Sequence, residues 1–275
     1  MPTLLLTAWL KQRLFLRALR RMSKLSASEL AVIIRSHHLP SLSRQAALAA
    51  LAESPLSTKE KMDTYVACVE DPDPGVQQWA ICAIEADGSG RAAVQMQAIA
   101  ALPGPNRIYA LRALASAGDP SVVELCESLL EHGAMAERVQ AVSCLGLMRS
   151  EPCQAILRSL FCEALPHDLR RYVALQLASC GDRSSEQFLQ RELKRCARWW
   201  PSWSARCWRL QVAVALTLLE NVAGMRVVKR VLLTGSPADA RILQTLVLRE
   251  PNFGIDRTET WRESLLEWLT ARGCT

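Results

Sequence analysis

The stretch Asp71-Pro72-Asp73-Pro74-Gly75-Val76-Gln77, followed by Ala80, Ile81 and Ile84, decides the fold. Two prolines, a glycine and two aspartates predict a tight turn, because these residues favour turn conformations and cap helix starts. The apolar residues three, four and seven places after Gln77 lie on one face of a helix. The stretch therefore predicts a turn that leads directly into a helix with one buried side.

The same helical face recurs along the chain. Six segments begin at Arg44, Gln77, Arg107, Arg138, Arg170 and Arg209, with spacings of 33, 30, 31, 32 and 39 residues. The third, fourth and seventh residues after each start are apolar or small: Ala47, Leu48 and Leu51; Ala80, Ile81 and Ile84; Ala110, Leu111 and Leu114; Ala141, Val142 and Leu145; Val173, Ala174 and Leu177; Val212, Ala213 and Leu216. A repeat of this period predicts structural units that stack on one another.

A second apolar-periodic segment lies between successive members of the repeat. Helix-start signals open these segments, at Ser57-Thr58-Lys59-Glu60, Asp119-Pro120, Ser150-Glu151-Pro152 and Asp182-Arg183-Ser184. Each unit then contains a helix A, a turn, a helix B and a turn. We predict an all-α protein, a right-handed α-solenoid (superhelix) of about six to seven helical hairpins with N- and C-terminal capping helices.

The turn and the helix B pattern at 71–84 resemble the HEAT-repeat superfamily, in particular the short HEAT-like repeats of the phycobilin-lyase type. Gln77 stands where that family usually has arginine. The resemblance covers residues 26–250 and implies the solenoid fold. It says almost nothing about chemistry, because function belongs to sites rather than to folds.

This pattern divides the chain into three regions. Residues 1–25 form a basic amphipathic helix, 26–250 form the solenoid with a Trp/Arg-rich insertion near 195–207, and 251–275 form a C-terminal capping helix. The cap is expected over 258–271, where Trp261, Leu265, Leu266, Trp268 and Leu269 have helical spacing.

Composition and charge exclude several classes of protein. Half of the 275 residues are apolar and 22% are charged, which argues against general disorder. No run of 18 apolar residues occurs, which argues against a membrane-spanning bundle. The net charge of +6 divides into +6 over residues 1–35, −6 over 57–163 and +6 over 164–275. The acidic middle argues against nucleic acid as the partner, because DNA would be repelled along half of the array.

No catalytic or cofactor motif is present. The sequence lacks a P-loop, Gly-x-Gly-x-x-Gly, His-Glu-x-x-His and Gly-x-Ser-x-Gly, so we assign no catalytic, cofactor or metal residues. The ten cysteines lie inside apolar helical patterns, and nothing resembles a cleavable signal peptide. We therefore expect free thiols that fill the core and a cytoplasmic location, with peripheral attachment to a membrane as the alternative.

The recurrent arginine at the start of helix B has two interpretations. Five guanidinium groups in a row could bind phosphate. The resemblance to HEAT-like stacks implies a structural ladder instead, in which each arginine pairs with an acid in a turn of its own or the next repeat, with Asp168 as one candidate partner, and we favour this interpretation.

Two places after each repeat start, the residues are Ala46, Trp79, Tyr109, Gln140, Tyr172 and Gln211. Aromatic and arginine side chains are common anchors of protein interfaces. We predict that a partner protein binds the concave face through Trp79, Tyr109, Arg112, Gln140 and Tyr172. The alternative is that these side chains pack against adjacent helices.

The 39-residue spacing marks an insertion. Residues 191–209 contain six basic residues, four of the eight tryptophans and one acid, Glu192. Solenoid insertions commonly form loops on the binding face, and tryptophan with arginine suits a protein or a lipid surface. The candidates for partner or lipid binding are Arg195, Arg198, Trp199, Trp200, Trp203 and Arg206. The alternative is that the tryptophans fill a widened seam between units while the cations stay in water.

Residues 11–24 predict a helix with Phe15, Leu16, Leu19 and Met22 on one side and basic residues on the other. Such a helix suits an anionic membrane surface, with Trp9, Lys11, Arg13, Phe15, Arg17, Arg20 and Arg21 as the candidate contacts. The alternatives are an N-terminal cap of the stack and an organellar targeting segment.

The leading functional prediction is a non-enzymatic scaffold or adaptor that binds a partner protein through its concave face and its Trp/Arg insertion. The alternative is a peripheral membrane adaptor anchored by the basic N-terminus. A bilin-lyase-like or nucleic-acid-acting enzyme ranks below both. The sequence contains no indication of oligomeric state.

Overall fold

The computed structural model describes residues 2–87, 90–196, 203–248, 253 and 261–274, with side chains from Gln12 onward. Helices joined by short turns make up the described residues, and no strand occurs among them. This confirms the predicted all-α solenoid of helical hairpins. The chain divides into two compact units, residues 1–128 (unit 1) and 129–275 (unit 2).

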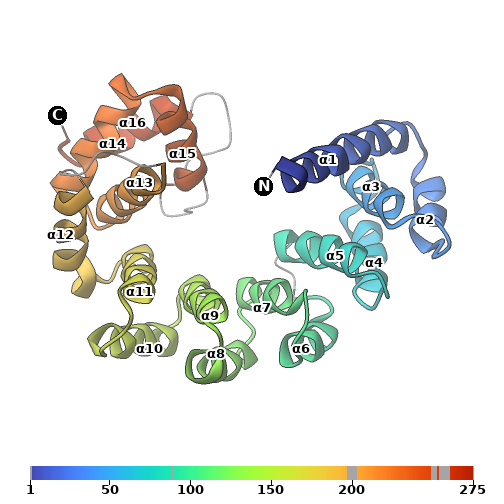
Figure 1. The fold of residues 1–275 in the computed structure, drawn as a ribbon, viewed down its shortest axis with the longest axis horizontal. Helices are drawn as coiled ribbons and strands as arrows, with labels where there is room; N and C mark the ends of the chain where they lie inside the picture. Colours follow the sequence, from blue (N-terminus) through green and yellow to red (C-terminus); the bar gives the residue numbers. More distant parts are fainter. Residues whose placement is uncertain (1, 88–89, 197–202, 249–252, 254–260, 275) are drawn as a thin grey trace. The chain divides into compact units, whose positions relative to one another are not determined.

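Unit 1 contains α1 and three helical hairpins (Figure 1). Within a hairpin the first helix is called the A helix and the second the B helix, so α2, α4 and α6 are A helices and α3, α5 and α7 are B helices. The bounds are α1 Pro2–Met22, α2 Ala27–Arg35, α3 Ser41–Ala52, α4 Thr58–Cys68, α5 Pro74–Asp87, α6 Ala93–Ala101 and α7 Arg107–Ser116. α8, Ser121–His132, begins in unit 1 and ends in unit 2.

Unit 2 continues the pattern with the B helix α9, three more hairpins and a last helix. The bounds are α9 Met135–Met148, α10 Glu151–Cys162, α11 His167–Ser179, the short 3-10 turn η1 Arg183–Ser185, α12 Glu186–Cys196, α13 Trp203–Leu218, α14 Val222–Thr234, α15 Pro237–Val247 and α16 Trp261–Ala271. α16 packs on α14 and buries Trp261, Leu265 and Leu269. The predicted start of this helix at 258 lies outside the described residues.

The core consists of the predicted repeat positions. All eighteen residues at the third, fourth and seventh places of the six repeat segments are at most 3% exposed. Small residues at several of these places let neighbouring B helices approach closely. The A helices begin where the capping signals predicted. At α4, for example, Ser57 and Glu60 form a reciprocal capping box.

The Trp/Arg-rich segment is partly helical, which corrects the expectation of a loop. α13 begins at Trp203, six residues before the repeat start at Arg209, so Trp203 and Arg206 lie in the first turns of a helix. Arg198, Trp199 and Trp200 lie outside the described residues.

Candidate binding surfaces

The B helices of unit 2 form a groove. A cavity of about 280 Å³ is lined by residues of α9, α11, α13 and α15: Ser143, Tyr172, Leu175, Gln176, Ser179, Gln211, Val214, Ala215, Leu218 and Leu246. Tyr172 is 39% exposed although it is a large aromatic residue. The lining combines an aromatic ring, amide and hydroxyl groups and apolar side chains, which is the composition of a protein-binding surface.

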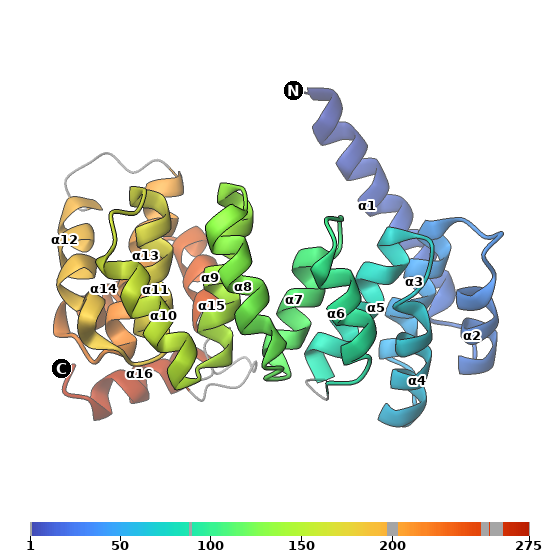
Figure 2. The same ribbon diagram turned by 90° about the horizontal axis from the view of Figure 1, so that it is seen from below.

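In unit 1, α1 lies against the B helices α3 and α5, but it leaves Trp79 38% exposed. α1 packs along α3, and the Phe15 ring stacks on Trp79 of α5 with ring centroids 5.6 Å apart and an interplanar angle of 19°. Ala46, at the matching position of α3, is fully buried. Figure 2 shows the N-terminal end of α1 extending beyond the hairpins of unit 1.

The two sides of α1 differ in exposure. Phe15, Leu19 and Met22 are half-buried, whereas Leu16 is 45% exposed, which corrects its predicted place on the packed side. The reason is periodicity: positions 15, 19 and 22 share one helical face, and position 16 is turned about 100° from position 15. The basic side chains lie outside, at Arg13, Arg17, Arg20, Arg21 and Lys24. Trp9 and Lys11 precede the first described side chain.

The other predicted concave residues have mixed surroundings. Tyr109 and Gln140 are half-buried. Arg112 donates a hydrogen bond of 2.7 Å from Nη2 to Oε1 of Glu85, so its charge is paired inside unit 1. Among these residues, Tyr172 is the one that lines the groove in unit 2.

The arginine ladder is present, but the acceptor of the arginine differs from one repeat to the next. Arg44 is 3% exposed, donates from Nη1 to Oδ1 of Asp71 over 3.1 Å, and donates from Nε to the Ile34 carbonyl over 2.8 Å. Asp71 lies in the turn of the next hairpin, as the ladder interpretation predicts. Arg107 and Arg170 donate to backbone carbonyls, those of Ala100 and Phe161. The suggested partner Asp168 pairs with the neighbouring Arg171 instead.

Gln77 continues the ladder without charge. Its Nε2 donates to the Val69 carbonyl over 2.6 Å, and its Oε1 accepts from Nδ2 of Asn106 over 2.6 Å. Asn106, which is 3% exposed, also donates to the Pro74 carbonyl. A half-buried amide and a buried one therefore take the place of an ion pair at this step of the ladder.

Glu192 of α12 organises the region around the Trp/Arg-rich segment. Its carboxylate is buried and accepts from Nε of Arg171 over 2.9 Å and from Nε1 of Trp208 over 3.1 Å. The guanidinium of Arg171 also lies 4.7 Å from the centre of the Trp208 ring. Burial raises the pKa of Glu192, but the hydrogen bonds from Arg171 and Trp208 outweigh it and lower the pKa below the usual value.

Glu192 and Trp208 were not among the predicted site residues. The feature of the sequence that could have identified Glu192 is that it is the one acidic residue in 191–209, a segment with six basic residues. Arg195 lies beside the same network, with Nη1 3.6 Å from Oε1 of Glu192, and keeps 62% of its side chain exposed. Trp203 is 59% exposed. Trp208 packs against the core, so tryptophans of this segment do not share one environment.

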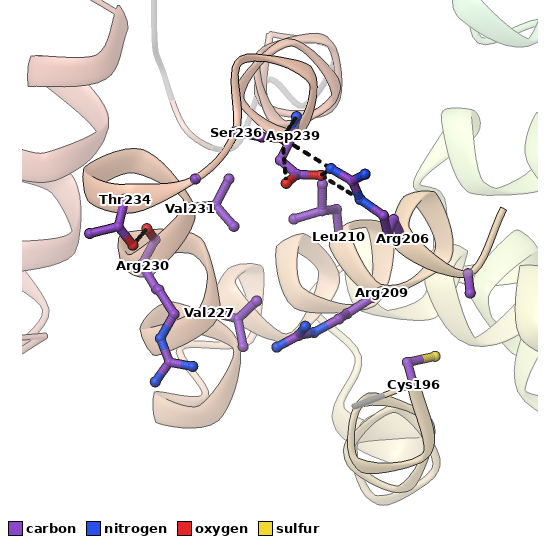
Figure 3. Close-up of a pocket in the computed structure, with 12 residues that line it drawn as sticks. Cys196, Arg206, Arg209, Leu210, Val227, Arg230, Val231, Thr234, Ser236 and Asp239 are labelled. Atoms are coloured by element: carbon purple, nitrogen blue, oxygen red, sulfur yellow. Dashed lines mark hydrogen bonds and ion pairs between the residues drawn. The ribbon is translucent and has the colours of Figure 1, made fainter. Parts of the chain in front are cut away.

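Two cavities flank this network. One of about 430 Å³ is lined by Arg171, Arg195, Cys196, Ser204, Ala205 and Trp208. The other, of about 460 Å³, lies between α12, α13, α14 and the start of α15 (Figure 3) and includes Arg206, Arg209 and Arg230 in its lining. Arg206 donates from Nε to Oδ1 of Asp239 over 3.0 Å.

Two groups that line the larger cavity, Asp239 and Cys196, have shifted pKa values. Partial burial raises the pKa of Asp239, but the hydrogen bonds from Ser236 and Arg206 outweigh it and lower the pKa. Burial also raises the pKa of the Cys196 thiol, and Glu192 raises it further. A thiol of this kind is a poor nucleophile at neutral pH, so the cavity is suited to binding rather than to thiol chemistry.

No group of three or more His, Cys, Asp or Glu side chains in the described part of the chain could hold a metal ion. None of the helices in that part combines the length and the apolar character that crossing a membrane requires.

No family model matches the sequence, and no curated protein matches it. The complex of CpcE and CpcF of phycocyanin lyase from Nostoc sp. PCC7120 resembles this chain in structure, with 17% sequence identity, a TM-score of 0.42, and coverage of 80% of this chain and 82% of that one. Identity and TM-score at this level transfer no property of that lyase to this chain.

Proposed function

We propose that this protein is a helical-repeat adaptor that binds a partner protein in the B-helix groove of unit 2. The observation that carries the proposal is the exposed ring of Tyr172, which lines a groove formed by four B helices. The partner presents an amphipathic helix whose apolar side meets Tyr172, Leu175 and Leu218, while its polar edge meets the amides of Gln176 and Gln211.

The other unit supports this choice of ligand. In unit 1 the amphipathic helix α1 packs against the equivalent helices. Its Phe15 ring stacks on Trp79, which occupies the same place in the repeat as Tyr172. Grooves of this kind commonly recognise helices by anchors spaced three, four and seven residues apart. Phe15, Leu19 and Met22 of α1 have that spacing.

The test is site-specific crosslinking in the cell. A photoreactive amino acid at position 211, in the same groove, should give a defined crosslinked partner, and adding Tyr172→Ala should lower recovery of that partner at least about tenfold, the usual loss at an interface anchor. Leu233→Ala is the matched control, because Leu233 is 61% exposed on the A helix α14, outside the groove. Equal recovery with both variants contradicts the proposal.

A second candidate, attachment to an anionic membrane, rests on one observation. Arg13, Arg17, Arg20, Arg21 and Lys24 are all exposed, together with Leu14 and Leu16. Cations near an anionic lipid surface contribute roughly 1 kcal/mol each to binding. Replacing Arg17, Arg20 and Arg21 with Gln should therefore abolish sedimentation with anionic vesicles, and binding that ignores lipid charge contradicts this candidate.

A further inference from the structure

The 460 Å³ cavity of unit 2 differs from the B-helix groove in its charge. Its lining includes three arginines, Arg206 of α13, Arg209 of α13 and Arg230 of α14, and one aspartate, Asp239. The formal balance of these four residues is +2. A cavity of this size lies in the range that encloses small molecules. This site is independent of the groove proposed above.

Arg209 departs from the structural role of its position. At the matching place in the repeat, Arg44 is held by Asp71, and Arg107 and Arg170 donate to carbonyl groups. Arg209 has a buried Nε that finds no hydrogen-bond acceptor among the described residues. The Nε atoms of Arg138 and Arg170 are also buried without an acceptor, but neither residue lines this cavity or the 430 Å³ cavity beside it. A buried donor without an acceptor is costly, which favours an acceptor supplied by a ligand.

The cations of the cavity are not equivalent. Arg206 is occupied by Asp239 and by the hydroxyl of Ser236. Arg209 and Arg230 line the same cavity from different helices (Figure 3). Guanidinium groups suit carboxylate and phosphate oxygens, because their N–H donors match the geometry of these anions.

The wall between these two arginines is apolar. Leu210, Val227 and Val231 line it, and Val227 and Val231 pack against the core of unit 2. An inorganic anion would contact the guanidinium groups but leave this wall exposed to water. A ligand with an apolar body covers the wall as well, and buried apolar area adds to affinity.

We propose that this cavity binds a small amphipathic oxyanion, a carboxylate or phosphate carried on an apolar body. Arg209 and Arg230 hold the anionic group, and Leu210, Val227 and Val231 contact the body. Arg206 is a positioning residue that fixes the start of α15 through Asp239.

The test uses four probes on the full chain, each below its micelle concentration: octyl phosphate, octanoate, octanol and inorganic phosphate. Calorimetric titration measures affinity, and chemical shifts of Val227 and Val231 methyl groups report the place of binding. Octyl phosphate and octanoate should bind at least about tenfold more tightly than octanol or inorganic phosphate. Binding of octanol as tight as that of the anions, or of inorganic phosphate as tight as that of octyl phosphate, overturns the proposal.

Variants identify the anchoring groups. Arg209→Gln and Arg230→Gln should each weaken octyl phosphate at least about tenfold. Arg241→Gln removes the same charge from an exposed place on α15 outside this cavity and should leave the affinity unchanged. Arg230 is exposed, so its variant folds whether or not Arg209→Gln does. Unchanged affinity in Arg230→Gln contradicts the assignment.

Discussion

The two units use the same repeat for different purposes. In unit 1, α1 packs on α3 and its Phe15 ring stacks on one side of the half-exposed Trp79, and the first arginine of the ladder pairs with a buried carboxylate. In unit 2 the B helices form a groove with the exposed Tyr172, and Arg209, the last arginine of the ladder, lines a separate cavity. A repeat position therefore contributes to stability where the chain itself supplies the partner of its side chain, and it is available for binding where the chain does not.

The largest expected effect tests the closed end of the ladder. Asp71→Ala removes the acceptor of Arg44 and leaves a buried guanidinium unpaired, which should lower the free energy of unfolding by about 3 to 5 kcal/mol. Urea denaturation measures this loss. Arg209→Gln is the comparison, and it should cost little, because Nε of Arg209 is already without an acceptor. Equal losses in both variants would break the contrast between the units.

The next effect tests the packing of unit 2. A methyl group at Gly224 of α14 would lie 2.5 Å from Cβ of Leu216 and 2.8 Å from the carbonyl oxygen of Ala213. Gly224→Ala should therefore lower the melting temperature and cost about 1 to 3 kcal/mol through overpacking between α13 and α14. Gly104→Ala, which meets no atom within 4 Å, is the control in unit 1. A neutral Gly224→Ala would show that these helices can separate without loss.

A smaller effect tests the occupied surface of unit 1. Phe15→Ala removes the ring stacked on Trp79, an interaction that contributes about 1 kcal/mol beyond the buried area. Amide hydrogen exchange should show faster exchange in α1 with little change in α3 and α5. Leu14→Ala, at a residue that is 51% exposed, should leave exchange in α1 unaltered. Slow exchange in both variants would mean that the stack does not hold α1.

The smallest effect is a pH dependence centred on Glu192. Because its pKa is lowered in the folded protein, its stabilising contribution is complete above the ordinary value of 4.5 and is lost as the pH falls through the lowered folded pKa. Glu192→Gln should flatten the fall of unfolding free energy below pH 4.5. Asp73, Asp119, Asp182 and Asp239 also have lowered pKa values, so a residual slope should remain. An unchanged slope in Glu192→Gln would contradict this role.

Local patterns predicted the fold well. The spacing of Ala80, Ile81 and Ile84 specifies one helical face, and the structure buries that face at every repeat. The capping box at Ser57 and Glu60 is equally local, because its two hydrogen bonds join residues three apart. Interactions of short range can be read from one segment, since the helix itself fixes their geometry.

The candidate sites depend on residues far apart in the chain, and there the sequence was less informative. The pattern of α1 shows that it is amphipathic but not that Phe15 meets Trp79, 64 residues later. Likewise Arg209 matches the other ladder arginines in sequence, and only the packing of α12, α13 and α14 leaves it facing a cavity. Tyr172 was predicted as an interface residue, and the groove around it is what the structure adds.

The docking of α1 also has a consequence for competition. Four residues, 23–26, join α1 to α2, so α1 meets its surface at an effective concentration in the millimolar range. A helix from another protein that is to replace it must overcome that local concentration in addition to the contacts themselves. The surface around Trp79 therefore binds only helical ligands whose affinity is high enough to displace α1. A ligand that displaces α1 releases a basic helix whose apolar side is then uncovered.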